Sequence, residues 1–330
     1  MALVKRVLLM LFLIWLTVTA TFFLIRLIPG NPIIMQLNQF VQQGMTYEAA
    51  LRKVNAMYNI KVNAPLIVQY FEYIGGLCHG QLGKSVLFPN ATILQLIAET
   101  LPWTVLTVAS SILVSFIIGI LLGTVVAYRR GGWLDQILTP VSSVLNGLPN
   151  YLIGTLLLFF FTVIVRWFPS QGAYSPNVVV GFNLPFILSV ARHAILPVCS
   201  YVISSFAGWV LLMKSNTISV LGENFIAGAR THGIPERRIM LRYVAPNSIL
   251  PMVTNVILSI AFLFGGSIFV ESIFNYPGIG YLFSQASANS DYALLQALFG
   301  VLTITVIVAN FIADILYTRL DPRITLEDIA

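Results

Sequence analysis

Six long apolar runs dominate the chain, and turn-forming or basic residues follow most of them. A helix needs about 20 mostly apolar residues to cross a bilayer, so each run predicts one membrane-spanning helix. The runs are residues 7–28, 101–128, 137–167, 194–213, 249–269 and 293–317. The pattern therefore predicts an all-α, polytopic membrane protein with six transmembrane helices.

Two apolar stretches depart from a plain span. The run 137–167 contains Pro140 and Pro149 and is long enough to be tilted or kinked. The weaker stretch 178–190 holds a glycine, an asparagine and a proline, and it is short for a span. We expect it to form an interfacial or re-entrant segment, with a seventh span as the alternative.

The first run resembles a signal peptide because Lys5 and Arg6 precede it. Its apolar part continues for nineteen residues, 7–25, and no small-x-small cleavage site follows. The apolar region of a signal peptide is shorter, about 7–15 residues. The pattern predicts a retained first transmembrane helix, residues 1–30.

The composition supports a bilayer as the solvent of this chain. Hydrophobic residues make up 58% of it, charged residues only 9%, and the mean hydropathy is +0.87. Soluble domains carry about a quarter charged residues, which excludes an ordinary water-soluble protein. The net charge of +6 is typical of cytoplasmic anchoring charges. We therefore expect contact with membrane lipid and no nucleic-acid partner.

The distribution of lysine and arginine predicts the orientation. If the N-terminus lies inside, the cytoplasmic segments carry most of these residues, and four of the outer ones fall in one long loop. The positive-inside rule gives little weight to long loops. The sequence thus predicts a multi-pass protein of the plasma (inner) membrane with both termini cytoplasmic.

The long outer loop, residues 31–99, contains one clear helix signal. Thr46 can cap a short helix over residues 46–54, and Glu48 lies in its first turn, where the helix dipole favours a negative charge. Further along, Gly83-Lys84-Ser85 resembles the end of a phosphate-binding loop. That motif requires a glycine five residues before Gly83, where this chain has Cys78, so we expect no nucleotide site.

Signals for catalysis or metal binding are scarce. There is no His-Glu-x-x-His or Gly-x-Ser-x-Gly motif, there are three histidines, and the two cysteines have no metal-ligand spacing. The apolar runs also contain few ionisable side chains. We expect no catalytic residues, no metal site and no cofactor bound by this chain.

The cytoplasmic loop between the fourth and fifth runs is the most informative segment. It predicts one short helix over 222–232, ended by Gly233, and a second from Pro235 to about residue 244. Small residues in the first helix would let another surface approach closely, and several arginines could bind an acidic partner. Two interpretations stay open, a docking surface and a solvated basic loop that only fixes topology.

This loop resembles the EAA loop of the membrane subunits of ABC importers. Gly233 matches the family's glycine, Ala229 the last alanine of its Glu-Ala-Ala triplet, and Pro246 its downstream proline. Ala227 and Gly228 depart from the triplet, as is common in the dipeptide/oligopeptide/nickel permease branch. Other similar segments follow in order along the chain: 26–32, 80–85, 100–104, 193–197, 270–280 and 320–324. The long outer loop resembles that of the first of two paired permeases.

The resemblance implies a type I ABC importer permease core over residues 100–318, with a coupling loop at 222–246 and a cytoplasmic tail at 319–330. Expected partners are a second, homologous permease, two cytoplasmic ATPases that carry ATP and magnesium, and an extracytoplasmic substrate-binding protein. The implied function is import of di- or oligopeptides, with oligosaccharides or nickel chelates as alternatives. An ion-coupled secondary transporter or an assembly protein without a transport path also stays open.

The resemblance also assigns site residues. Those expected to couple the loop to an ATPase are Glu223, Ala227, Gly228, Ala229, Arg230, Gly233, Pro235, Arg237, Arg238 and Pro246. Candidates for the translocation pathway or for contact with the binding protein are Asn146, Pro149, Ser267, Glu271 and Asn275. Helix packing is the alternative role for these residues. For Glu271 the alternative is a carboxylate hydrogen-bonded to nearby backbone.

Overall fold

The computed structural model describes the backbone of residues 2–27 and 31–320, and every regular element in these ranges is helical. The predicted all-α class is therefore confirmed. The chain forms two compact units, one of residues 1–104 and 277–308 and one of residues 105–276 and 309–330. Of the predicted tail, 319–330, all but the first two residues lie outside the described ranges.

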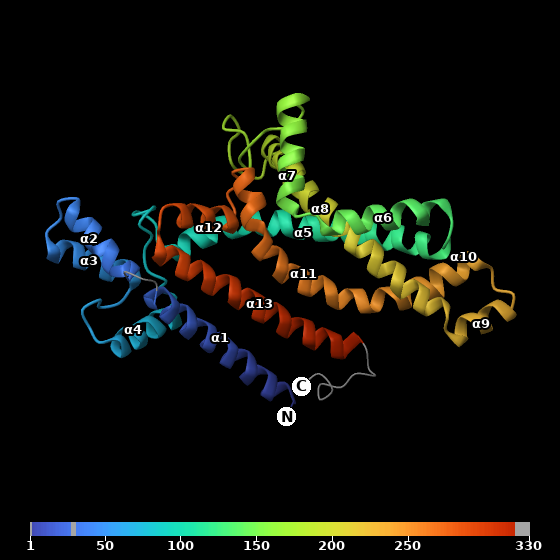
Figure 1. The fold of residues 1–330 in the computed structure, drawn as a ribbon, viewed down its shortest axis with the longest axis horizontal. Coiled ribbons are helices and arrows are strands. Elements are labelled where there is room, and N and C mark those ends of the chain that lie inside the picture. Colours follow the sequence, from blue (N-terminus) through green and yellow to red (C-terminus); the bar gives the residue numbers. More distant parts are fainter. Residues whose placement is uncertain (1, 28–30, 321–330) are drawn as a thin grey trace. The chain divides into compact units, whose positions relative to one another are not determined.

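The first unit contains the N-terminal helix and the outer loop. Its elements are α1 (Ala2–Leu27), α2 (Pro32–Gln42), α3 (Tyr47–Tyr58), α4 (Leu66–Cys78), the start of α5 (Ile93–Tyr128), α12 (Ile279–Ala288) and the start of α13 (Tyr292–Leu320) (Figure 1). The predicted cap of α3 is confirmed, because Thr46 Oγ1 accepts a hydrogen bond from the Ala49 amide at 3.4 Å. The outer loop is thus folded into three helices rather than the single one that was predicted.

Aromatic packing attaches α4 to α1. The Phe22 ring is fully buried, and its centroid lies 5.4 Å from the ring centroids of both Tyr70 and Tyr73. The hydroxyl groups of Thr19 and Tyr70 are 2.7 Å apart and share a hydrogen bond. The C-terminal half of α1 is therefore covered by a helix of the loop that follows it.

The Gly83-Lys84-Ser85 segment has a structural role. Gly83 has φ of +87°, and a Cβ there would lie 1.9 Å from the Met57 carbonyl oxygen, so no other residue fits. Ser85 Oγ donates a hydrogen bond to Asp291 Oδ2 at 2.6 Å, and the Val86 amide donates to the same oxygen at 2.7 Å. The segment thereby fixes the outer loop to the residue that precedes α13.

The second unit contains most of the apolar helices. Besides the remainders of α5 and α13, its elements are α6 (Trp133–Gly147), α7 (Asn150–Leu158), the π-helical η1 (Phe159–Ile164), α8 (Leu184–Leu221), α9 (Asn224–Thr231), α10 (Glu236–Ile239), the π-helical η2 (Met240–Val244) and α11 (Ala245–Ile273). Helix α8 is central in this unit, since α6, α7 and α11 all pack against it.

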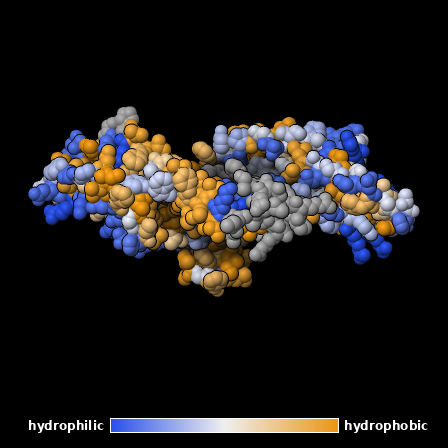
Figure 2. Space-filling model, turned by 90° about the horizontal axis from the view of Figure 1, so that it is seen from below, coloured by the Kyte–Doolittle hydropathy of each residue, from blue (hydrophilic) through white to orange (hydrophobic). Residues whose placement is uncertain are grey.

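The helices match the six apolar runs. Among the described residues, α1, α5, α8 and α13 are long and apolar enough to cross a membrane, and the pair of α6 and α7–η1 is a further candidate. Helix α11 covers the fifth predicted run. Figure 2 shows hydrophobic side chains over the face of α1, as expected for a surface in contact with lipid.

The third apolar run is broken rather than tilted. Its two helices are bent by 98° at Leu148 and Pro149. Proline has no amide hydrogen to continue the helix, and it drives the preceding residue into an extended conformation. Leu148 accordingly has φ −84° and ψ 130°. Pro140, by contrast, lies inside α6 without ending it.

The prediction of a separate interfacial segment at 178–190 was wrong. Residues from Leu184 onward form the first turns of α8, which starts ten residues before the predicted span and ends at Leu221. Asn183 caps this helix by accepting a hydrogen bond from the Phe186 amide at 2.9 Å, and a proline in the first turn is compatible with a helix start.

Two glycines let α5 and α8 approach closely. A Cβ on Gly119 would lie 2.2 Å from Trp209 Cβ, and one on Gly123 would lie 2.6 Å from Met213 Cβ. The two glycines are four residues apart, so they lie on one face of α5. Small residues at this spacing allow close packing between membrane helices, where no hydrophobic driving force holds helices together.

Candidate functional site

The loop between α8 and α11 is held by a small hydrophobic cluster. Ile226 and Ala229 on α9 are buried against Ile239 and Val244, which follow on α10 and η2. Ile226, Ile239 and Val244 are fully inaccessible to solvent. This packing gives α9 a fixed position, which a solvated loop serving only topology would not need.

The end of α9 is as predicted. Gly233 has φ of +70°, the left-handed conformation that favours glycine. Its amide donates to the Arg230 carbonyl at 2.9 Å, and the Ile234 amide donates to the Ala229 carbonyl at 3.2 Å. These two bonds form a Schellman motif, which satisfies carbonyl groups at the helix end and turns the chain sharply.

The second helix of the loop differs from the prediction. Pro235 lies at the N-cap of α10 rather than in its first turn, and the helix does not end near residue 244. It continues through the π-helical η2 into α11. Pro246 explains the wider turns, because it has no amide hydrogen for the Arg242 carbonyl and its ring would clash with that group in a regular α-helix. The second helix of the loop is therefore continuous with α11, which covers the fifth apolar run.

One arginine of the loop has an internal partner. Arg230 Nε donates to Glu236 Oε1 at 2.8 Å, and the Tyr128 hydroxyl at the end of α5 also bonds the Glu236 carboxylate. The Arg230 bond, followed by the Tyr128 bond, lowers the pKa of Glu236 below its ordinary value. These contacts join α9, α10 and α5, so Arg230 stabilises the loop in addition to any contact with a partner.

Arg237 and Arg238 are exposed on α10. Glu223, Pro235, Gly233 and Pro246, also predicted to belong to the coupling site, are exposed as well. Figure 2 shows hydrophilic side chains at the end of the second unit where α9 and α10 lie. The loop thus presents a basic, accessible surface.

The face of α9 turned away from the cluster consists of small or polar side chains. Asn224, Ala227 and Thr231 are exposed, and Gly228 lies among them. A Cβ added to Gly228 would meet no atom within 4 Å. The fold of this chain therefore does not require a glycine at this position. A partner that approaches this face closely would require one.

Asn146 and Pro149 lie at the break between α6 and α7, and both are exposed. Asn146 Oδ1 approaches α8 closely, since a Cβ on Gly208 would lie 2.9 Å from it. Pro149 is the N-cap of α7. This geometry brings a polar group and a sharp bend together, which is compatible with either a pathway or a packing role.

Ser267 and Glu271 on α11 are both fully buried within the second unit. The Ser267 carbonyl accepts a hydrogen bond from the Tyr201 hydroxyl at 3.5 Å. Burial, and secondly the negative charge of Glu271, raise the pKa of Tyr276. In this conformation neither Ser267 nor Glu271 reaches the surface, and their role in a pathway stays a prediction.

Asn275, unlike Ser267 and Glu271, is exposed. It has φ of +44°, and its Nδ2 donates to Gln171 Oε1 at 2.7 Å. The Gly172 amide donates to the Phe274 carbonyl at 3.0 Å. The turn after α11 is therefore bound to the loop that precedes α8.

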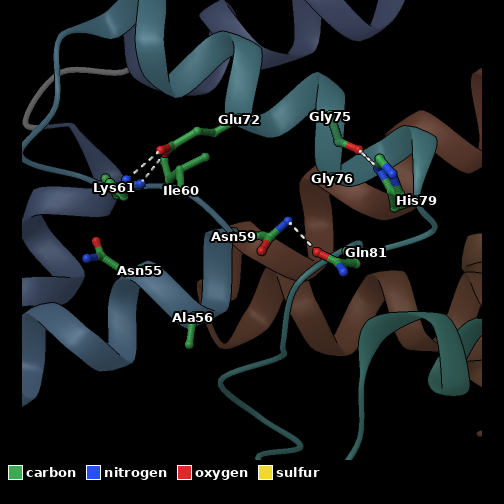
Figure 3. A pocket seen from close by; sticks show the side chains of 10 residues that line it. All are labelled: Asn55, Ala56, Asn59, Ile60, Lys61, Glu72, Gly75, Gly76, His79 and Gln81. Carbon is green, nitrogen blue, oxygen red and sulfur yellow. Dashed lines mark hydrogen bonds and ion pairs between the residues drawn. The ribbon is translucent and has the colours of Figure 1, made fainter.

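Sequence reasoning missed a pocket lined by polar residues in the first unit. It has a volume of about 610 Å³ and lies between α3 and α4 (Figure 3). Lys61 Nζ lies 3.4 Å from Glu72 Oε1, and Asn59 Nδ2 donates to Gln81 Oε1 at 3.4 Å. Only the tertiary fold brings these residues together, because they come from different helices and turns.

Comparison with known proteins supports the importer interpretation. The family described as "binding-protein-dependent transport system inner membrane component" matches residues 119–326. The oligopeptide transport system permease protein AppB of Bacillus subtilis is 31% identical over 92% of each chain. The nickel import system permease protein NikB of Staphylococcus aureus is 30% identical over 98% of this chain and 91% of its own.

The fold itself is also found in a solved structure. The inward-facing MetNI methionine ABC transporter matches with a TM-score of 0.56 and 14% identity, over 69% of this chain and 97% of that one. The family match, the permease relatives and the apolar helices agree with one another. This chain belongs to the binding-protein-dependent transport system inner membrane component family, as a multi-pass inner-membrane permease of the peptide and nickel branch of ABC importers.

Proposed function

We propose that this chain forms half of the translocation pathway of an ATP-driven importer of di- or oligopeptides, and that α9 docks a cytoplasmic ATPase. The observation that carries this proposal is the construction of α9. It is fixed by a buried cluster and a Schellman motif, yet it exposes a face of small residues with open space at Gly228. The ATPase partners would supply the nucleotide and magnesium sites.

The continuity of α10, η2 and α11 suggests how motion is transmitted. A rigid-body shift of α9 would move α10 through the Arg230–Glu236 bond and the shared cluster. The helix would carry that shift into the membrane through α11. This coupling corresponds to alternating access driven by a two-state element.

A contact of the same loop supports our proposed orientation. The Tyr128–Glu236 bond places the basic residues Arg129 and Arg130 at the same end of the second unit as the arginines of α10. The positive-inside rule favours a cytoplasmic location for such a cluster. We assign the loop and both termini to the cytoplasm, and the outer loop to the face reached by a substrate-binding protein.

The partners in this proposal are a second, homologous permease, two ATPase subunits and the binding protein. A peptide substrate is favoured by the relatives named as peptide permeases. Nickel chelates are the second candidate, because NikB is similar over nearly the whole chain at almost the same identity.

The test is reconstitution of the assembled transporter in lipid nanodiscs. ATPase activity is measured with binding protein loaded with peptides or with nickel chelates. We expect stimulation by the peptide-loaded form, and we expect Arg238→Glu to release or uncouple the ATPase. Arg52→Glu, an exposed reversal on the outer helix α3, serves as the matched control. An ATPase that stays bound and stimulated in Arg238→Glu and Gly233→Asp would contradict the docking role of the loop.

A further inference from the structure

Helix α4, in the first unit, has an exposed apolar face. Ile67 is 61% exposed and Phe71 is 66% exposed, Cys78 is also exposed, and Ile74 is half-buried. Their spacing of four, three and four residues places them on one face of the helix. The only charged residue of α4, Glu72, does not belong to this face. A run of large apolar side chains on a surface is typical of a site that contacts another apolar surface.

A second side of α4 packs on α1. The rings of Tyr70 and Tyr73 both lie 5.4 Å from the ring of the buried Phe22, measured between centroids. At 100° per residue, these two tyrosines point away from the exposed apolar face. The helix is therefore attached to α1, which is long and apolar enough to cross a membrane.

A third side of α4 borders the pocket between α3 and α4. Glu72 and Gly76 line this pocket, and Figure 3 shows Glu72 turned toward Lys61. The helix thus has one side on protein, one apolar exposed side and one polar side. A helix at a membrane surface needs this distribution, because it meets lipid on one side and water on another.

The contact with α1 gives the depth of α4. Thr19, whose hydroxyl shares a hydrogen bond with the Tyr70 hydroxyl, lies about 12 Å along the helix axis before Leu27. The apolar part of α1, Val4–Leu27, is about 36 Å long, about 6 Å longer than the hydrocarbon core of a bilayer. Even if all of this excess lies at the Leu27 end, Thr19 is about 6 Å inside the hydrocarbon. The Tyr70 hydroxyl reaches the same depth, so α4 lies where acyl chains meet headgroups.

The aromatic surface of α1 continues onto α4. Phe23 and Leu24 of α1 are 41% and 60% exposed, as expected for side chains in contact with lipid. The Phe23 ring stacks on Tyr70 at a centroid distance of 6.0 Å, and the Tyr70 ring lies 5.5 Å from the ring of Phe71. No charged side chain interrupts this row. The lipid that surrounds α1 is therefore the occupant favoured for the exposed face of α4.

We infer that α4 is an interfacial membrane anchor, with Ile67 and Phe71 inserted among lipid acyl chains and the side of Glu72 turned toward water. The anchor keeps the pocket between α3 and α4 at the membrane surface. This inference goes beyond the proposed function, which assigns no role to α4. Only the choice of the outer leaflet rests on the orientation proposed above.

The inference is tested on the assembled transporter in nanodiscs of phosphatidylethanolamine and phosphatidylglycerol. Phe71→Cys and Ile67→Cys, each in a Cys78→Ser, Cys199→Ser background, are labelled with the environment-sensitive fluorophore NBD. Arg52→Cys, at an exposed position of α3, is the matched control. We expect phosphatidylcholine that carries a doxyl group near the head of its acyl chain to quench the labels on α4 at least about threefold more than the control. Aqueous iodide should show the opposite order.

Two labelled positions are used so that a local distortion at one of them does not decide the result. Quenching of both labels by iodide to the same extent as the control would show that the face lies in water, and would overturn the inference. Labels shielded from both quenchers would show that a protein surface covers the face, which would also overturn it. Binding of the ATPase is measured in parallel, and its loss would count against the docking proposal rather than against the anchor.

Discussion

Gly228 offers the sharpest test of how α9 is used, because the folded chain does not itself need a glycine there. The residue has ordinary helical geometry, and a Cβ would meet no atom within 4 Å. Replacing glycine with alanine inside a helix stabilises it by roughly 0.5–1 kcal/mol. Gly228→Ala and Gly228→Leu should therefore leave the permease as stable as the wild type, or slightly more stable.

The same substitutions should overpack the contact between α9 and the ATPase. Extra methylene groups in a well-packed contact cost about 1–3 kcal/mol. This cost corresponds to a roughly 5- to 150-fold higher dissociation constant. We expect Gly228→Leu to weaken ATPase binding within this range and Gly228→Ala to have a smaller effect. The assay is titration of the ATPase subunit onto the permease pair in nanodiscs, with thermal unfolding of the permeases measured separately.

Ala227→Ser is the matched control, since it adds one atom to a neighbouring exposed position of the same helix. Wild-type ATPase affinity in Gly228→Leu, at unchanged permease stability, would refute a close approach to this face. A large loss of permease stability in Gly228→Ala would refute the structural argument that this position is open.

Three further predictions concern backbone geometry and buried contacts. Gly233→Val should destabilise the loop by about 1–2 kcal/mol in thermal unfolding, because the backbone φ at this position is +70°. Gly233→Asn should destabilise it less, and equal destabilisation by both substitutions would contradict this explanation. Asp291→Ala should leave the Ser85 hydroxyl and the nearby amides without an acceptor, at a cost of about 1–3 kcal/mol for each buried donor. It should also speed proteolysis of residues 79–92. Unchanged resistance to proteolysis would argue against a stabilising bond between Asp291 and this segment. Gly119→Leu should separate α5 from Trp209 and lower the unfolding temperature, and a neutral result would show that these helices do not pack as described.

The sequence by itself determined the features that depend on neighbouring residues. Six apolar runs are long enough to span a bilayer, and each corresponds to a helix or a broken pair. Thr46 and Gly233 act at helix ends through their own side chain or backbone, so their roles could be predicted without any tertiary contact. Pro149 carried the signal for a bend, although not its size.

Only the tertiary structure decided the contacts between distant parts of the chain. Asp291 binds the segment at Ser85, which is 206 residues away in sequence, and no local pattern encodes that pairing. Arg230 gave the same sequence signal as Arg237, yet it bonds Glu236 within the chain. Which face of α4 stays exposed depends on the packing of another side of this helix on α1. Local hydrogen bonding and hydropathy fix where helices begin and end, whereas burial and pairing depend on side chains that become neighbours only when the helices pack.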